Sequence, residues 1–289
     1  MLTRAAYAKV NLSLEVVARR DDGFHEIVSV MQMLDLADTL TFDEADDITL
    51  ESNEPSLDAE GEDNLILKAA KALQQASGKQ RGARIKLDKV IPIAAGLGGG
   101  SSDAAATLQA LAELWDVNLS KGELRELGAT LGSDVPFFLG GPTALVEGRG
   151  ERVTSIPPPP TGWVVLVCEP YSVRNKTQLL YRSLHKKDMS DGNTTRQLLA
   201  ALLEGSFPPS NLLANTFERV AYDTFDGLAA VRRRVLHAGG REVHLSGSGP
   251  TLFSLFPRSQ QARARTLHQT LQAEGLRSYL TRTLTKSDL

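Results

Sequence analysis

Residues Ile91 to Leu108 read IPIAAGLGGGSSDAAATL, and this stretch carries the strongest structural signal in the chain. Between an apolar run and two serines it places four glycines, Gly96, Gly98, Gly99 and Gly100. Glycine adopts positive φ angles and lets backbone N–H groups approach a ligand closely. The alanine-rich pattern that follows predicts a helix, whose first turn presents unpaired N–H groups and a partial positive charge. The stretch therefore predicts an anion site, with phosphate favoured, in a protein that handles a nucleotide.

The length and composition of the chain indicate a globular protein of two domains. Its 289 residues exceed what one core of ordinary size holds. Four consecutive prolines, Pro157 to Pro160, cannot continue a helix or a sheet, so they are the expected linker. We therefore expect an N-terminal domain over residues 1–156 and a C-terminal domain over 161–289.

Charge and residue usage argue against several classes of protein. A formal net charge of −3 gives no electrostatic support for nucleic-acid binding. The sequence lacks the ~20-residue apolar stretch of a membrane span, and its N-terminus shows no cleavable signal pattern. The single cysteine, Cys168, excludes an intrachain disulfide, and the five histidines form no zinc-like cluster. We expect a cytoplasmic protein that binds neither nucleic acid nor membrane.

Apolar periodicity predicts a mixture of strands and helices in both halves. Strands are predicted over 9–17, 27–36, 83–90, 163–168, 242–245, 251–256 and 277–283, with two shorter pieces within 39–51. Helices are predicted over 64–76, 101–115, 120–131, 195–204, 216–237 and 260–274. Asp63 or Asn64 is placed to cap the first helix, Asp103 to lie in the first turn of the second, and Ser120 with Glu123 to form a capping box. Because strands and helices do not alternate regularly, the fold class is α+β.

The glycine stretch does not match the common phosphate loops. The chain contains no Gly-Lys-Ser or Gly-Lys-Thr, so a P-loop is excluded. Ser101 stands where the Rossmann fingerprint needs its third glycine. The Asp-Phe-Gly motif of protein kinases and the G-x-S-x-G motif of serine hydrolases are also absent from the sequence.

The stretch instead resembles the second motif of the GHMP kinases, which include galactokinase, homoserine kinase and mevalonate kinase. The matching residues are Pro92-x-x-x-Gly96-Leu97-Gly98-Gly99-Gly100-Ser101-Ser102, followed by the helix. Ser246-Gly247-Ser248-Gly249-Pro250 is similar to the third motif, although alone it is equally typical of a hairpin turn. The first motif, AKVNLSL over 8–14 with RDDGFHE over 20–26, narrows the resemblance to the 4-diphosphocytidyl-2-C-methyl-D-erythritol kinase family.

This resemblance runs nearly end to end and implies both a fold and an activity. It implies a two-domain α+β GHMP kinase fold, with an N-terminal domain like ribosomal protein S5 and a ferredoxin-like C-terminal domain. The implied reaction is ATP-dependent phosphorylation of a 2-hydroxyl on a small molecule that carries a cytidine diphosphate, in the non-mevalonate isoprenoid route. Mg²⁺ is the expected metal, and a monomer or weak homodimer the expected state. The match is poor over 171–210, where Arg174-Asn175-Lys176 and the polar run 186–195 are unexpected.

The resemblance assigns catalysis to Lys9 and Asp134. Asp134, in LGSDVP, is implied to accept the proton of the substrate hydroxyl, and Lys9 to keep that aspartate ionised. On residue type alone, Asp134 could simply close a helix, and Lys9 could be a solvated lysine on a strand. For the substrate, the resemblance implies that Phe24 stacks on cytosine, that His25 bonds its polar edge, and that Asn11 lines the same side. A core phenylalanine beside a surface histidine is the alternative.

The remaining implied residues bind ATP or complete the third motif. The nucleotide set is Pro92, Ile93, Ala94, Ala95, Gly96, Leu97, Gly98, Gly99, Gly100, Ser101 and Ser102, with Asn64, Leu65 and Lys89 at the adenine end. The third-motif set is Gly247, Ser248 and Gly249. Ser102 is the candidate magnesium ligand, and Glu147 and Asp103 are weaker ones. The chain departs from the family at Ala94-Ala95, where glycine is common, so ATP affinity or loop mobility could differ.

Two other functions stay open on the sequence. A different GHMP kinase, acting on homoserine or mevalonate, would have no use for a base pocket at Gly23-Phe24-His25. A catalytically silent ligand-binding relative would have no need to keep both Lys9 and Asp134.

Overall fold

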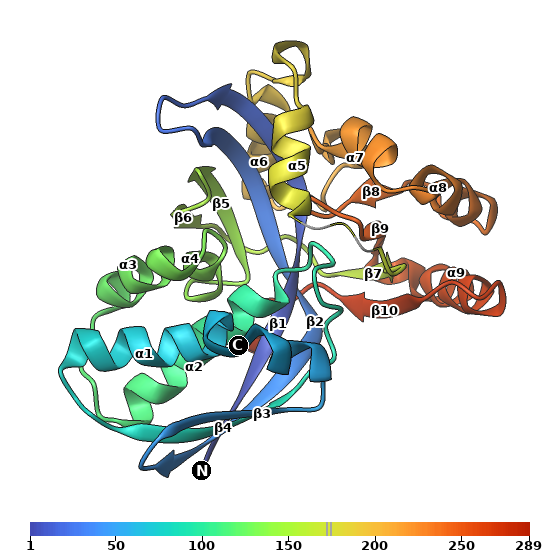
Figure 1. Cartoon of the computed structure of the whole chain (residues 1–289). Coiled ribbons are helices and arrows are strands. Elements are labelled where there is room, and N and C mark those ends of the chain that lie inside the picture. The colour runs from blue at the N-terminus through green and yellow to red at the C-terminus, as the bar shows by residue number, and fades with distance from the viewer. Residues whose placement is uncertain (172, 174) are drawn as a thin grey trace. The chain divides into compact units, whose positions relative to one another are not determined.

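The computed structural model describes residues 1–171, 173 and 175–289, and the chain forms two compact units that are interleaved along the sequence (Figure 1). Unit 1 consists of Met1–Ala8, Leu36–Ala94 and Gly98–Gly141. Unit 2 consists of Lys9–Asp35, Ala95–Leu97 and Pro142–Leu289. Two long strands, β1 (Leu2–Arg19) and β2 (His25–Ala45), contribute to both units.

Unit 1 places four helices beside a small sheet. The C-terminal part of β2 pairs antiparallel with β4 (Gly82–Asp88), which pairs parallel with β3 (Ile48–Ser52). The helices are α1 (Leu65–Ser77), α2 (Gly99–Leu114), α3 (Lys121–Leu131) and α4 (Val135–Phe138), with a 3₁₀ segment at Pro55–Asp63 before them. α1 and α2 run side by side (Figure 1). Apolar residues that are fully buried, among them Phe42, Leu73, Ile85, Leu108 and Trp115, form the core of the unit.

Unit 2 contains two antiparallel sets of strands. The N-terminal part of β2 pairs with β5 (Thr143–Gly148), and β5 pairs with β6 (Arg152–Ser155). A four-stranded sheet has the order β10-β7-β9-β8 (Ser278–Arg282, Gly162–Val167, Leu252–Pro257 and His244–Leu245). The helices are α5 (Lys176–Ser183), α6 (Asn193–Leu203), α7 (Glu218–Thr224), α8 (Leu228–His237) and α9 (Gln261–Ala273).

One hydrophobic core joins the strands and helices of unit 2. Leu14 and Val16 of β1 and Ile27 of β2 pack in the same cluster as residues from β7, α5, α7, α8, β9 and α9. Burial of these side chains is the main favourable term for the unit, at ~25 cal/mol per Å² of apolar surface. Residues at both ends of the sequence are therefore needed to complete this core.

The predicted α+β class and most predicted elements are confirmed. The first two strands are longer than predicted, because β1 already begins at Leu2 and β2 continues from the predicted strand 27–36 to Ala45, where a separate short piece was expected. The single helix predicted over 216–237 is wrong, because the chain turns at Phe225–Gly227 and divides it into α7 and α8. Phe225 is extended there, and Gly227 has a φ of +80°. The strands β5 and β6 and the helices α4 and α5 were not predicted. Pro157 to Pro160 lie inside unit 2. The expected boundary between domains 1–156 and 161–289 stays a prediction.

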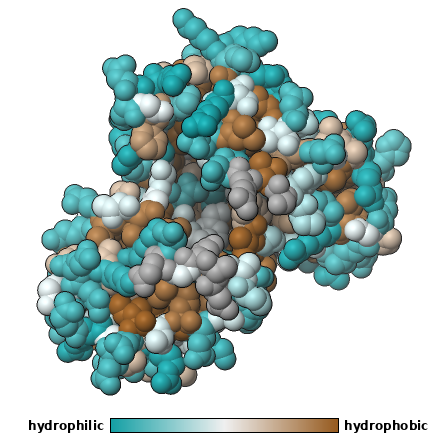
Figure 2. Space-filling view, viewed as in Figure 1, coloured by the Kyte–Doolittle hydropathy of each residue, from teal (hydrophilic) through white to brown (hydrophobic). Residues whose placement is uncertain are grey.

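The exterior is largely polar. Figure 2 shows a face on which hydrophilic side chains predominate, with apolar side chains visible in several separate areas. None of the helices in the described part of the chain combines the length and apolar character that crossing a bilayer requires.

Candidate active site

The glycine loop leads directly into the N-terminus of α2. Gly98 has a φ of +73° and caps the helix without any side-chain hydrogen bond. The first helical backbone bond runs from the Ser102 N–H to the Gly98 carbonyl at 2.9 Å. The N–H groups of Gly99, Gly100 and Ser101 therefore precede the helical ladder, where they are oriented toward an anion.

Two residues of the loop, Gly96 and Ala94, have positive φ angles, which suit glycine and are unfavourable for alanine. Gly96 has a φ of +84°, and a Cβ added there would lie 2.5 Å from the Ser246 carbonyl oxygen, so only glycine fits. Ala94 has a φ of +51°, a left-handed conformation that is unfavourable for alanine. The strained residue thus lies in the Ala94-Ala95 pair, where this chain has alanine and glycine is common in the family.

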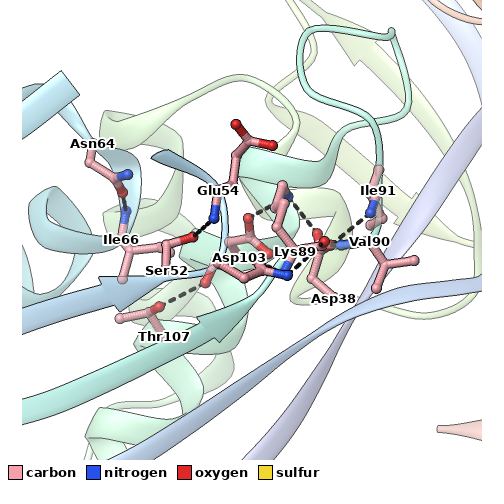
Figure 3. A network of polar contacts seen from close by, with 11 residues as sticks. Asp38, Ser52, Glu54, Asn64, Ile66, Lys89, Val90, Ile91, Asp103 and Thr107 are labelled. Carbon is pink, nitrogen blue, oxygen red and sulfur yellow. Dashed lines mark hydrogen bonds and ion pairs between the residues drawn. The ribbon is translucent and has the colours of Figure 1, made fainter. Parts of the chain in front are cut away.

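A buried ionic network fixes the segment before the loop to α2 (Figure 3). Lys89 Nζ lies 2.5 Å from Asp38 Oδ2 and 2.8 Å from Asp103 Oδ2. Asp38 Oδ1 accepts hydrogen bonds from the N–H groups of Val90 and Ile91, at 2.6 and 2.8 Å. One lysine and two carboxylates thus position both the start of the loop and the helix that follows it.

Two members of this network, Asp103 and Lys89, have shifted pKa values. Burial raises the pKa of the Asp103 carboxyl to about 7, against the lowering effect of the Lys89 charge. Burial lowers the pKa of Lys89, but Asp103 and Asp38 together raise it above its ordinary value. Asp103 Oδ1 is buried and has no hydrogen-bond partner in the described structure. The prediction that Asp103 lies in the first turn is wrong, since the first turn of α2 contains no acidic residue.

The residues expected at the adenine end lie near the glycines but have structural partners of their own. A Cβ built on Gly99 would lie 2.9 Å from Lys89 Nζ, and one built on Gly100 would lie 3.7 Å from Leu65 Cδ1. Asn64 is confirmed as the N-cap of α1, because its side chain accepts the Ile66 N–H at 2.9 Å. Their assignment to adenine stays a prediction.

Asp134 lies in unit 1, which also contains Gly98, Gly99 and Gly100 of the glycine loop. It is half-buried and occupies the position before α4, whose second residue is Pro136. The Val135 N–H donates to the Gly132 carbonyl at 3.2 Å, which closes the turn around Asp134. A Cβ at Gly132 would lie 3.8 Å from Ser101 Oγ, so this turn and the start of α2 are close neighbours.

In unit 2, the structure brings the three sequence motifs together. The Lys9 N–H donates to the Leu97 carbonyl at 2.9 Å, which joins the first motif to the second. The Ser246 hydroxyl donates to the Gly96 carbonyl at 3.0 Å, and the Thr251 N–H to the Ala95 carbonyl at 3.2 Å. These contacts join the third motif to the second.

The side chains of Lys9 and Asn11 lie at the turn of the third motif. Lys9 Nζ donates to Asn11 Oδ1 at 2.7 Å, and both side chains are buried. A Cβ at Gly247 would lie 3.2 Å from Lys9 Nζ and 3.3 Å from Asn11 Oδ1, which accounts for glycine there. Lys9 belongs to unit 2 and Asp134 to unit 1.

Asn215 was not predicted as a site residue, yet it holds the turn of the third motif. Its Nδ2 donates to the carbonyls of Leu245 and Gly247, each at 2.8 Å. Its Oδ1 accepts the Phe217 N–H at 2.9 Å. Nothing in the local sequence distinguishes this asparagine from one in an ordinary loop, because the two carbonyls to which its Nδ2 donates lie 30 and 32 residues away.

The aromatic residues expected to bind a base lie at the turn between β1 and β2. Phe24 is 50% exposed, and the Arg149 guanidinium lies 5.1 Å from the centre of its ring. The His25 ring stacks on the Tyr181 ring at 4.8 Å, and Tyr181 meets Phe217 edge-on. Burial lowers the pKa of His25, and the Arg19 charge lowers it further, which favours the neutral imidazole. Tyr181 was missed because it lies in the poorly matching segment.

The same segment brings a lysine to the third motif. Lys176, the first residue of α5, donates to the Gly249 carbonyl through Nζ. The hydroxyl groups of Thr177 and Ser248 lie 2.9 Å apart. Burial lowers the pKa of Lys176 to about 8, with a further contribution from the Lys9 charge. Arg174, also singled out in the sequence, lies outside the described residues.

The described residues hold no cluster of three or more acidic, histidine or cysteine side chains suited to a metal ion. Asp103 shares one oxygen with Lys89, and Glu147 lies on β5. The Ser102 side chain is buried at the start of α2, directly after the glycine turn. This donor set suits Mg²⁺ only where phosphate oxygens and water supply most of its ligands, the usual case for this ion.

Comparison with known proteins gives consistent matches over both halves of the chain. The model of the GHMP kinases N terminal domain matches residues 64–141, and that of the GHMP kinases C terminal domain matches 198–270. A 4-diphosphocytidyl-2-C-methyl-D-erythritol kinase of Dehalococcoides mccartyi is 42% identical over 98% of this chain and 99% of its own length. The Bacillus subtilis kinase of the same name is 41% identical over 86% of each chain.

Solved structures agree with these matches. A crystal structure of 4-(cytidine 5'-diphospho)-2C-methyl-D-erythritol kinase is 36% identical, with a TM-score of 0.81 over 98% of this chain and 99% of that one. The homoserine kinase of Cytophaga hutchinsonii is 19% identical, with a TM-score of 0.73 over 97% and 95%. At that identity, the second likeness concerns the fold alone.

Proposed function

We propose that this chain phosphorylates the 2-hydroxyl of 4-diphosphocytidyl-2-C-methyl-D-erythritol with ATP, because it belongs to the GHMP kinases and, within them, to the family named for that substrate. The reaction belongs to the non-mevalonate route to isoprenoid precursors. The structural observation that supports it most is the hydrogen-bonded meeting of the three motifs around Lys9 and Gly96.

The glycine loop and α2 would hold the phosphates of ATP. The free N–H groups at the start of α2 supply donors, and the helix dipole favours negative charge there. The Lys89 network with Asp38 and Asp103 would hold this N-terminus in position. Mg²⁺ bound with ATP, with Ser102 as its candidate protein ligand, would neutralise part of the phosphate charge.

Asp134 would accept the proton of the substrate hydroxyl. As that oxygen forms its bond to the γ-phosphorus, the bond from phosphorus to the leaving ADP oxygen breaks, and the hydroxyl proton passes to the carboxylate. The rigid turn before α4 is suited to this role, because phosphoryl transfer depends chiefly on positioning and charge stabilisation. Lys9 would contribute positive charge to the acceptor side, where Asn11 fixes its ammonium group.

The spacing along β2 suits an acceptor with a base at one end. Asn11 Nδ2 donates to Ser29 Oγ at 2.8 Å, and Lys9 Nζ donates to Asn11 Oδ1. The Lys9 and Asn11 side chains therefore lie near Ser29 of β2. His25 lies four residues earlier on the same strand, or ~13 Å at 3.3 Å per residue. A base beside Phe24 and His25 would then be separated from Lys9 by enough room for a ribose and two phosphate groups.

The direct test is an assay of ADP release with three acceptors side by side: the cytidylyl substrate, homoserine and mevalonate. We expect turnover with the cytidylyl substrate alone. Phe24→Ala should raise its KM by about 10- to 100-fold with little change in the KM of ATP, since stacking contributes ~1–3 kcal/mol per base. Turnover of homoserine or mevalonate instead would contradict the proposed substrate.

Asp134→Asn separates catalysis from binding in the same assay. The substitution keeps the shape of the side chain but removes its basicity, so we expect turnover to fall by at least about 100-fold. Binding of ATP, measured by calorimetry, should stay within about twofold. Turnover within tenfold of the unmodified protein would rule out Asp134 as the proton acceptor. A chain that binds all ligands but turns over none would be a silent relative.

A further inference from the structure

Lys176 is a partly buried cation for which the described residues provide no acidic partner. Its Nζ donates to the Gly249 carbonyl, and it forms no ion pair among the described residues. Burying an ammonium group without a carboxylate is costly, because the lost hydration is not replaced by an opposite charge. A lysine in this setting calls for an anion that the chain itself does not provide.

The surroundings of Lys176 increase its need for an anion. The Lys9 charge is close enough to lower the pKa of Lys176, so two ammonium groups share one region of unit 2. The Thr177 and Ser248 hydroxyls, next in sequence to Lys176 and Gly249, hydrogen-bond to each other, which leaves one of the two with a proton to donate. The turn between Lys9 and Lys176 is held by Asn215 and by Gly96, through Ser246. Two cations and two hydroxyls on a fixed turn form a site for a multiply charged oxyanion.

A purely structural role explains this residue poorly. The Gly249 carbonyl needs only one donor, and a neutral amide or hydroxyl would supply it at a lower desolvation cost. An ammonium group has three N–H donors, and the described contacts account for one of them. The positive charge is the part of the side chain that the folded chain does not use.

Taking the function proposed above as the premise, we propose that Lys176 binds phosphate oxygens of the reacting ligands, as a second cation beside Lys9 at the turn of the third motif. Two sources can bring those oxygens. One is the γ-phosphoryl group of ATP, and the other is the diphosphate of the cytidylyl acceptor. Both present the same chemistry to the ammonium group, and the measurements below distinguish them.

The test compares Lys176→Met, Lys176→Gln and Lys176→Arg with Lys186→Met. Met removes the charge at similar length, Gln keeps a neutral donor for Gly249, and Arg keeps the charge. Lys186 is exposed on the same unit and controls for the loss of one surface charge. We expect kcat/KM to fall by about 10- to 100-fold in the Met and Gln variants, to recover in part with Arg, and to stay unchanged in Lys186→Met.

Calorimetry identifies which phosphate Lys176 contacts without relying on activity. A loss of CDP affinity in Lys176→Met, with cytidine affinity unchanged, assigns it to the acceptor's diphosphate. A loss of ATP affinity, with AMP affinity unchanged, assigns it to the transferred phosphoryl group. Unchanged affinity of Lys176→Met for both CDP and ATP, or full recovery of kcat/KM in Lys176→Gln, would overturn the inference. The proposed function would not be affected, because the kinase assay of the unmodified chain tests it separately.

Discussion

Ala94 shows how one residue can carry strain in a loop that we propose to bind ATP. Its φ of +51° lies in the left-handed region, which costs an L-residue with a Cβ roughly 1–2 kcal/mol. Its side chain is exposed, so no packing compensates for this cost. Glycine at this position would remove the strain but would add flexibility to the unfolded chain.

We therefore expect Ala94→Gly to stabilise the fold by about 0.5 kcal/mol, because the relieved strain exceeds the added entropy of the unfolded chain. Urea denaturation measures the change. Ala95→Gly is the matched control, since Ala95 is buried and does not have a positive φ; it should destabilise by about 1 kcal/mol. A loss of stability in Ala94→Gly would show that the alanine conformation is not strained.

At the scale of elements, the Lys89 network joins Asp38 of β2 to Asp103 of α2 through the lysine that follows β4. The pKa of Asp103 is raised, so its neutral form is favoured in the folded state. The stabilisation that goes with this raised pKa is present at acid pH. It is lost as the pH rises through about 7, because the folded carboxyl must then ionise in a buried site.

Because this stabilisation is lost as the pH rises, the free energy of unfolding should fall by about 2 kcal/mol between pH 5 and pH 8, when it is measured relative to that of Asp103→Asn. Asparagine does not titrate, so the difference between the two proteins isolates Asp103. Asp116→Asn, at an exposed aspartate of the same unit, controls for the loss of one carboxylate from that unit. A difference that stays constant, or that grows with pH, would contradict the raised pKa.

The elements could be predicted from the sequence wherever local chemistry decides them. The Asn64 cap, the Ser120 capping box and the glycine turn before α2 all depend on residues within four positions of one another. The break between α7 and α8 was missed because apolar periodicity continues through it, although Gly227 was a visible signal.

The residues of the candidate site could likewise be predicted only where a local sequence motif contains them. Lys9, Gly96 and Ser246 could be singled out because each lies in a motif, and the structure brings them together. The partnership of Lys89 with Asp38, the hold of Asn215 on its turn, and the approach of Lys176 to Gly249 depend on residues far apart in sequence. Such contacts exist only after the chain has folded, so no local pattern announces them.

At the scale of the whole molecule, unit 2 cannot be completed by the first 156 residues. Leu14, Val16 and Ile27 have their core partners in residues 165–276. A fragment ending at residue 156 would leave these apolar side chains exposed to water.

We expect the fragment 1–156 to aggregate and to bind a hydrophobic dye, as measured by gel filtration and fluorescence. The full chain cleaved at a protease site placed within 157–160 is the control. It has the same new ends but keeps the partners, so it should stay folded and monodisperse. A monodisperse fragment 1–156 that unfolds cooperatively and binds no dye would contradict this expectation.

The same interleaving has a consequence during synthesis on the ribosome. Leu14, Val16 and Ile27 emerge early, but the β7, α7 and α9 side chains that cover them are translated more than a hundred residues later. At ~5–20 residues per second, the nascent chain carries this uncovered apolar surface for roughly ten seconds or more. Yield in a cell would then depend on nascent-chain chaperones and translation speed, even where the finished protein is stable.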